Sequence, residues 1–215
     1  MVLRTPEELE EIKRRFLERY KGSRTELKYK NDYELLVAII LSAQCTDKRV
    51  NMVTPELFKK YPDIESLSKA NVEDVKEIIK SCNFFNNKAK NLVAMAKAVK
   101  EKHKGKIPRE HKELIKLPGV GNKTANVFLI EIEGENRMAV DTHVFRVVHR
   151  LGITDAKTVK ETEKDLIEAF KTNLNELHQG FVLFGRYICK AKNPECEKCF
   201  VTDFCVSKEN FKPKG

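Results

Sequence analysis

Apolar residues recur at helical spacing along nearly the whole chain, and this pattern restricts the fold more than any other feature. Eight segments show it, and no convincing period-2 strand pattern is present. The segments are residues 5–20, 31–44, 71–82, 86–105, 121–134, 141–152, 158–170 and 174–189. The chain has only 9 Gly and 7 Pro, as expected for helices joined by short turns. The sequence therefore predicts an all-α fold.

Two of these helices have clear start signals. The first opens with Thr5 as N-cap, Pro6 at the first helical position and Glu8 closing a capping box. The second starts at Asn31 and is apolar nearly all round. We therefore expect the second helix to lie in the centre of the core.

The chain is basic and rich in charge. It has 215 residues, of which 41% are hydrophobic and 34% charged, and its net charge is +9. An excess of Lys and Arg is common in proteins that bind polyanions, although many basic proteins bind no nucleic acid. The N-terminal residues lack an apolar signal core, and the apolar run at 35–41 is too short to span a bilayer. We expect a cytoplasmic protein, or a nuclear one if the cell has a nucleus, without membrane contact.

The six cysteines fall into two groups. Cys45 and Cys82 stand singly, and in a reducing compartment they are most simply buried free thiols. The other four follow the spacing C-x6-C-x2-C-x5-C, at Cys189, Cys196, Cys199 and Cys205. Four thiolates so close in sequence can converge on one centre, and their spacing leaves an iron–sulfur cluster and a zinc ion open. The same loop carries three lysines that are either phosphate ligands or solvated charges, Lys190, Lys192 and Lys198.

A tight glycine turn joins two expected helices at "LPGVGNKTANVFLI", residues 117–130. We expect Gly119 and Gly121 to permit positive φ and close backbone approach. The amides of such a turn and of the next helix start can hold a DNA phosphate without reading sequence. The alternative is an αα-hairpin with no ligand.

Two charged residues stand at helix starts. Lys123 lies on the first turn after the glycines, where a cation is electrostatically unfavourable. Its long stem can carry the ammonium to water, or the position can serve to keep the amine neutral. Asp141 or Thr142 is a natural N-cap for the helix in "DTHVFRVVHRLG", and Asp141 can otherwise be a carboxylate that faces a pocket.

Several motifs in one order resemble the endonuclease III family, the helix-hairpin-helix DNA glycosylases with a Gly-Pro-Asp region. They are "LLVAIILSAQCTDKRVN", "FFNNKAKNL", "LPGVGNKTANVFL", "VDTHVFRVVHRLG" and the four-cysteine loop. The resemblance implies a two-lobed all-α fold, with a six-helix barrel at 25–135 and a cluster domain at 1–24 and 136–215. It also implies a [4Fe-4S] cluster on the four loop cysteines, with Lys123 and Asp141 as the catalytic pair.

The activity implied is base excision repair of double-stranded DNA with a damaged base or an abasic site. The enzyme would remove oxidised pyrimidines through a Schiff base on Lys123 and cut the 3′ side by β-elimination. Gln44 and Phe84 match the positions of the family's wedge side chains, although an aliphatic residue is commoner at the second. If these residues have no role in DNA binding, we expect Gln44 to be a helix-end residue and Phe84 to pack in the core.

Other functions remain open at this point. The same fold serves glycosylases for mismatched uracil or thymine, for oxidised guanine, or for adenine opposite oxidised guanine. Lys123 argues against the last of these, which usually lacks a lysine there. A non-catalytic DNA-binding module and an iron–sulfur electron carrier are the alternatives outside this enzyme class. We expect a monomer.

Overall fold

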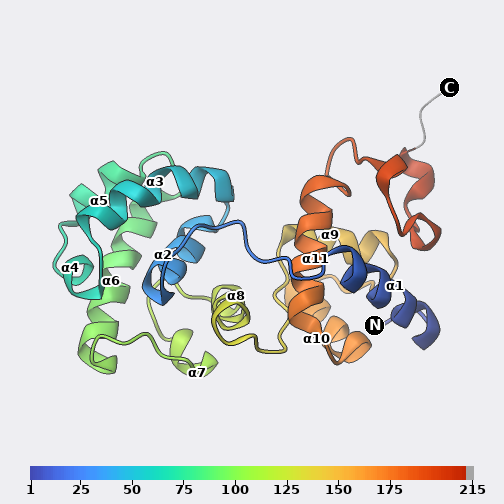
Figure 1. The fold of residues 1–215 in the computed structure, drawn as a ribbon, viewed down its shortest axis with the longest axis horizontal. Helices are drawn as coiled ribbons and strands as arrows, with labels where there is room; N and C mark the ends of the chain where they lie inside the picture. Colours follow the sequence, from blue (N-terminus) through green and yellow to red (C-terminus); the bar gives the residue numbers. More distant parts are fainter. Residues whose placement is uncertain (212–215) are drawn as a thin grey trace. The chain divides into compact units, whose positions relative to one another are not determined.

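The computed structural model describes residues 1–211, and within them every regular element is helical (Figure 1). The α-helices are α1 (Pro6–Arg19), α2 (Asp32–Ser42), α3 (Asp47–Lys60), α4 (Ile64–Ser68), α5 (Val72–Ile79), α6 (Phe85–His103), α7 (His111–Leu114), α8 (Asn122–Glu133), α9 (Thr142–Arg150), α10 (Val159–Phe170) and α11 (Leu174–Tyr187). Three short 3-10 helices follow, η1 (Cys196–Lys198), η2 (Thr202–Phe204) and η3 (Lys208–Phe211). The β pairing in this part of the chain is one isolated bridge between Val2 and Thr154. The predicted all-α class is confirmed.

The chain divides into two compact units. Unit 1 comprises Met1–Thr25 together with the residues from Gly134 onward, and unit 2 comprises Glu26–Glu133. Unit 2 therefore contains α2 to α8, of which α4 and α7 are short. The six-helix barrel stays a prediction. No helix within residues 1–211 is long and apolar enough to cross a membrane.

Helix α2 forms the centre of unit 2, as its composition predicts. Asn31 caps it by accepting a hydrogen bond from the backbone N–H of Glu34, at 2.9 Å. Every residue from Tyr33 to Leu41 is buried. Helices α3, α6 and α8 pack against it, so each face of α2 meets another helix (Figure 1). This enclosure explains why an apolar helix without a polar face is stable here.

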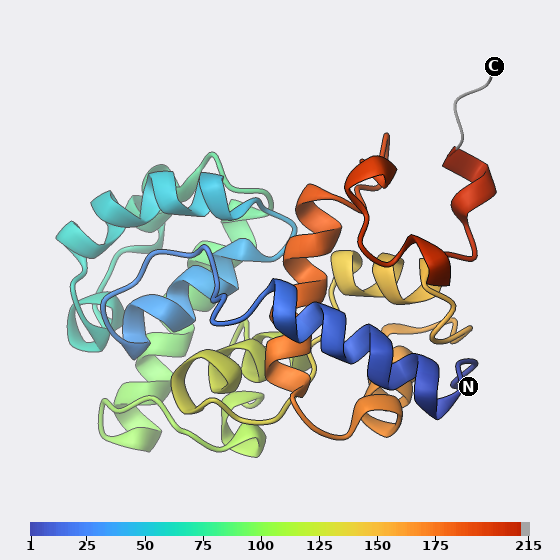
Figure 2. The same ribbon diagram turned by 45° about the vertical axis from the view of Figure 1, so that its right-hand side comes forward.

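Helix α11 has the same central role in unit 1, where α1 and α9 pack along it (Figure 2). Phe16 of α1 meets Phe181 and Phe184 edge-on, with ring centroids 4.6 and 5.3 Å apart. At Gly185 a Cβ atom would lie 2.9 Å from Cβ of His143, so only glycine lets α9 approach α11 this closely. Aromatic packing and one close backbone approach therefore fix the core of unit 1.

The predicted N-terminal capping box is confirmed. Thr5 Oγ1 accepts a hydrogen bond from the N–H of Glu8, and the Glu8 carboxylate accepts one from the N–H of Thr5. Pro6 occupies the first helical turn, where its missing N–H costs nothing. Local sequence alone is enough to start this helix.

Candidate functional site

The glycine turn between α7 and α8 needs only one of its two glycines for backbone reasons. Gly119 has φ +78°, and a Cβ there would lie 2.9 Å from Cβ of Asn91. Gly121 is outside the left-handed region, and a Cβ there would enter open space. The expectation that both glycines adopt positive φ is therefore wrong for Gly121. Its carbonyl accepts the first helical hydrogen bond of α8, from the N–H of Ala125 at 3.0 Å.

Lys123 lies on the first turn of α8, in unit 2. Its side chain is half-buried, and within residues 1–211 it has neither an ion pair nor a hydrogen bond. The next eight residues of the helix are buried. Lys123 is thus an amine without a counter-ion at the start of a buried helix, where the unpaired N–H groups of the backbone bear partial positive charge.

Asp141 is the N-cap of α9, in unit 1. Its Oδ1 accepts a hydrogen bond from the N–H of Val144 at 2.8 Å, so the predicted capping role is confirmed. Two residues on, His143 is half-buried, and burial lowers its pKa while the charge of Asp141 opposes this. The guanidinium of Arg146 donates to His143 Nδ1 at 3.2 Å, which leaves the proton of a neutral ring on Nε2.

Gln44 and Phe84 occupy neighbouring loops of unit 2. Both are exposed, and both have left-handed backbones, with φ of 52° and 56°. Phe84 is 61% exposed, so the alternative that it packs in the core is wrong. Asn83 Nδ2 donates to the carbonyl of Gln44 at 2.7 Å and joins the two loops. Left-handed non-glycine residues are uncommon and concentrate at functional sites.

A buried lysine that the sequence did not single out supports these loops. Lys88 of α6 is 6% exposed, and its Nζ donates to the carbonyls of Leu41 and Ala43 at 2.8 and 2.6 Å. Burial lowers its pKa. These carbonyls stand at the end of α2, where no further turn can satisfy them. The only signal in the sequence is a lysine between apolar positions of a helix.

The four loop cysteines line one pocket in unit 1. Its walls come from the ends of α9 and α11 and from the loop, as Arg150, Leu151, Phe184, Ile188, Cys189, Pro194, Cys196, Cys199 and Cys205. Burial raises the pKa of Cys196 and of Cys205, and the neighbouring cysteines raise both further. Bound iron reverses this preference, because a coordinating thiol is deprotonated.

The donor set fits an iron–sulfur cluster. Four thiols face one pocket with apolar walls, and Nη1 of Arg150 lies 3.4 Å from Sγ of Cys189, where it can offset thiolate charge. A four-iron cluster binds each thiolate to a separate iron, whereas zinc gathers all four around one ion. Among the described side chains, no group of three or more His, Cys, Asp or Glu stands around a single ion position.

Arginines and aromatic rings attach the cysteine loop to the helices of unit 1. Arg15 donates to the carbonyl of Phe200 at 3.0 Å and pairs with Asp203 at 2.8 Å. The Phe200 ring lies 5.0 Å from that of Phe16 and 5.2 Å from that of Phe184. The loop position is therefore set by α1 and α11 as well as by any bound cluster.

The three loop lysines differ in their surroundings. Lys190 and Lys198 both form ion pairs with Glu195, and their hydrogen bonds lower the pKa of Glu195 to about 2. Lys192 is exposed and has no ion pair within the described part of the loop. Lys192 is accordingly the loop lysine whose charge is not compensated locally.

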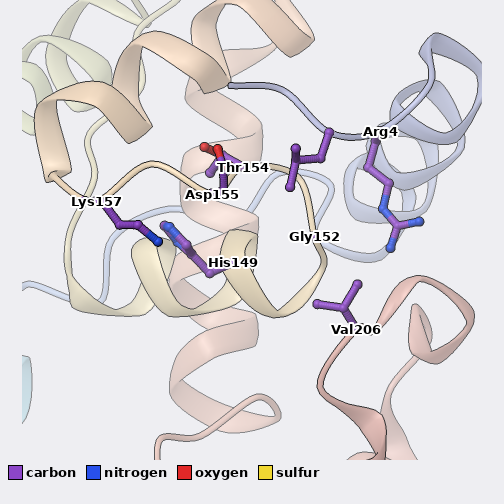
Figure 3. Close-up of a pocket in the computed structure, with 8 residues that line it drawn as sticks. Arg4, His149, Gly152, Thr154, Asp155, Lys157 and Val206 are labelled. Atoms are coloured by element: carbon purple, nitrogen blue, oxygen red, sulfur yellow. The ribbon is translucent and has the colours of Figure 1, made fainter.

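A second cavity in unit 1 involves none of the predicted site residues within the described chain (Figure 3). Its volume is about 470 Å³, and it is lined by Leu3, Arg4, His149, Gly152, Thr154, Asp155, Lys157 and Val206. Arg4 Nε donates to the carbonyl of Leu151 at 3.0 Å. Both ring nitrogens of His149 lie 2.7 Å from backbone carbonyls, those of Phe145 and Ala156. The imidazole of His149 and the guanidinium of Arg4 therefore already have hydrogen-bond partners, and Arg4 also pairs with Glu8.

Comparison with known proteins identifies the class of this chain. Residues 37–172 match the model of the HhH-GPD superfamily of base excision DNA repair proteins. Residues 189–205 match the iron–sulfur binding domain of endonuclease III, which confirms the expected iron–sulfur centre. The all-α fold, the glycine hairpin and the cysteine loop, together with these matches, define a helix-hairpin-helix base excision repair protein.

Individual relatives narrow the assignment. Endonuclease III of Rickettsia conorii is 46% identical over 190 residues, which cover 88% of this chain and 90% of the relative. Endonuclease III of Escherichia coli is 38% identical over 200 residues, which cover 93% of this chain and 95% of the relative. A trapped covalent intermediate of endonuclease III with DNA is 36% identical, with a TM-score of 0.90 over 97% of this chain and 99% of that one. The chain belongs to the endonuclease III family.

Replacing Gly119 by Ala should lower the free energy of unfolding by about 1–2 kcal/mol, the cost of a left-handed backbone for a residue with a Cβ. The new methyl would also press on Asn91 at 2.9 Å. Gly121→Ala is the matched control, and it should change stability by less than about 0.5 kcal/mol. Urea denaturation measures both variants, and equal losses would contradict the different roles of the two glycines.

Replacing Lys88 by Met should lower the free energy of unfolding by roughly 1–3 kcal/mol, because two carbonyls at the end of α2 lose their donor. Lys90→Met removes the same charge from an exposed position of α6 and should leave stability within about 0.5 kcal/mol. The midpoints and slopes of urea denaturation curves give the free energy of unfolding of both variants. Similar stability of both variants would mean that the buried ammonium contributes nothing.

Proposed function

We propose that this protein is a DNA glycosylase and abasic-site lyase that removes oxidised pyrimidines from double-stranded DNA. The observation that carries the proposal is Lys123, an amine without a counter-ion directly after a glycine turn suited to phosphate. Membership of the endonuclease III family supports it, and one similar structure holds that enzyme covalently joined to DNA.

The reaction begins when the base leaves the stack, because its glycosidic bond is out of reach within the duplex. The neutral amine of Lys123 attacks C1′ of the sugar, and the bond to the base breaks with its electron pair. Loss of a proton from nitrogen and opening of the sugar ring give a Schiff base. This imine acidifies C2′, and loss of that proton expels the 3′ phosphate by β-elimination.

Asp141 supplies the acid–base partner in this proposal. Its carboxylate stabilises positive charge that develops on the sugar and accepts protons from the amine. Because Oδ1 is held by the N–H of Val144, the carboxylate has a fixed orientation at the start of α9. The cap therefore positions the group as well as beginning the helix.

Three surfaces would bind the duplex. The hairpin amides around Gly119 and Gly121 take a backbone phosphate. Gln44 and Phe84 enter the gap left by the displaced nucleotide, where the amide bonds the orphaned base and the ring stacks. The exposed, strained conformations of both residues support this role. Lys192 supplies a further phosphate contact, and Lys190 and Lys198 do so only if Glu195 releases them.

The [4Fe-4S] cluster would be held by Cys189, Cys196, Cys199 and Cys205. When bound, it supplies a covalent cross-link among four points of the loop. The chain itself orients the loop through Arg15 and Phe200, and thereby presents Lys192 at the surface. We propose that the protein acts as a monomer on DNA that carries a damaged base or an abasic site.

Borohydride trapping on duplex DNA with one thymine glycol should give a covalent adduct with the wild-type protein and none with Lys123→Gln. Lys116→Gln, a change of an exposed lysine in the same hairpin, should trap normally. Asp141→Asn, which keeps the helix cap, should lower single-turnover excision about 100-fold or more. An adduct with Lys123→Gln would assign the nucleophile elsewhere. No adduct with wild type on this lesion or on an abasic site would refute the lyase.

Lys192→Gln should weaken duplex binding and reduce the slope of log K against log[salt] by about 0.9, the value for one phosphate contact. Lys198→Gln removes the same charge but should have a smaller effect, because Glu195 already compensates it. Fluorescence anisotropy over a series of salt concentrations measures both slopes. A larger effect of Lys198→Gln would contradict the role given to Lys192.

A further inference from the structure

Cys45 and Cys82 are neighbours, although the sequence places them far apart. Asn83 donates from its side chain to the carbonyl of Gln44, and each cysteine is adjacent in sequence to one partner of this bond. The Cys45 thiol also lies close enough to Cys82 to raise its pKa. Both cysteines are free thiols, as expected, but only Cys82 is buried.

The backbone holds both cysteines in tight turns. The N–H of Cys45 donates to the carbonyl of Ser42 at 3.0 Å, and that of Cys82 donates to the carbonyl of Ile79 at 2.8 Å. Cys82 is 2% exposed, whereas Cys45 is half-buried. One cysteine is thus partly open to a reagent in solution, and the second is buried. This is the arrangement of an attacking and a resolving thiol.

Cations surround the pair. Burial raises the pKa of Cys82 to about 11, and the nearby charges of Lys88 and Arg49 act in the opposite direction. The ammonium of Lys88 is fixed by the carbonyls of Leu41 and Ala43, so it cannot swing away from the thiols. Burial outweighs these charges, so the pKa of Cys82 stays above its usual range and Cys82 is the resolving rather than the attacking thiol.

We propose that Cys45 and Cys82 form a redox-active thiol pair whose disulfide ties together the two loops that carry Gln44 and Phe84. The oxidant is a low-molecular-weight disulfide. The Cys45 thiolate attacks one of its sulfurs and releases one small thiol. Cys82 then attacks Cys45 Sγ in the mixed disulfide and releases the second small thiol. The protein loses two hydrogens and two electrons, and the reagent gains them.

The disulfide acts on the loops that lead to the proposed wedge residues. A covalent S–S bond is shorter than a thiol–thiol contact, so closing it draws the two loops together. Gln44 precedes Cys45 directly, and Phe84 follows Cys82 by two residues. Small displacements of groups that position a substrate reduce rates steeply. The effect on DNA rests on the proposed function of Gln44 and Phe84, whereas formation of the bond does not.

The experiment treats the cluster-loaded protein with oxidised glutathione, blocks remaining thiols by alkylation and maps peptides by mass spectrometry. Wild type should yield the peptides of Cys45 and Cys82 joined, two hydrogens lighter than the reduced pair. Cys82→Ser should stop at a glutathione adduct on Cys45. Cys45→Ser should give neither product. The cluster absorbance is followed throughout, and only samples that retain it are used.

Single-turnover excision of a thymine glycol then compares reduced, oxidised and re-reduced protein. The oxidised wild type should react at least roughly threefold more slowly and recover with dithiothreitol. Cys45→Ser should show no response to the oxidant. Failure to form the joined peptides, or their formation with unchanged excision, overturns the proposal. No excision by the reduced protein would refute the proposed function instead, and the peptide map would still test the thiol pair.

Discussion

A buried ammonium at the end of α2 holds together the part of unit 2 that carries the proposed wedge residues. The carbonyls of Leu41 and Ala43 lie where α2 ends, so no further turn of the helix can satisfy them. Lys88 of α6 supplies the missing donors to Leu41 and Ala43. Because Lys88 belongs to α6, its hydrogen bonds join the start of α6 to the end of α2 and so hold the two adjoining loops together. The left-handed conformations of Gln44 and Phe84 persist within that fixed frame.

The same support explains the thiol pair. Cys45 and Cys82 belong to the two loops that Lys88 and Asn83 join, and their proximity follows from that joining. Burial raises the pKa of the Cys82 thiol, although the nearby charges of Lys88 and Arg49 act in the opposite direction. One buried charge therefore supports the backbone and the proposed DNA contacts, and it lies near the two cysteines.

Unit 1 uses a different means to position its loop. The cysteine segment has little regular structure of its own, and side chains from α1, α9 and α11 hold it through Arg15, Arg150 and the ring cluster around Phe200. Glu195 pairs two of the loop lysines within the segment. A basic loop thus presents fewer free charges than its composition indicates.

Signals that act over a few residues could be predicted from the sequence. The Thr5 capping box, the Asn31 and Asp141 caps, the buried character of α2 and the four-cysteine spacing all depend on neighbours in the chain. The expectation for Gly121 failed because one positive-φ glycine is sufficient for this turn. Phe84 could equally have packed in the core, since apolar character alone does not say which side of a helix start faces water.

The sequence by itself determined the helical class, the helix starts and a four-cysteine metal site, because periodicity, caps and ligand spacing are local properties of the chain. Tertiary structure alone decided the partners of Lys88, the contact between Cys45 and Cys82, the exposure of Phe84 and the pairing of Lys190 and Lys198 with Glu195. Most of these arise where separate helices or loops meet. Such meetings depend on how the whole core packs, and no short stretch of residues encodes them.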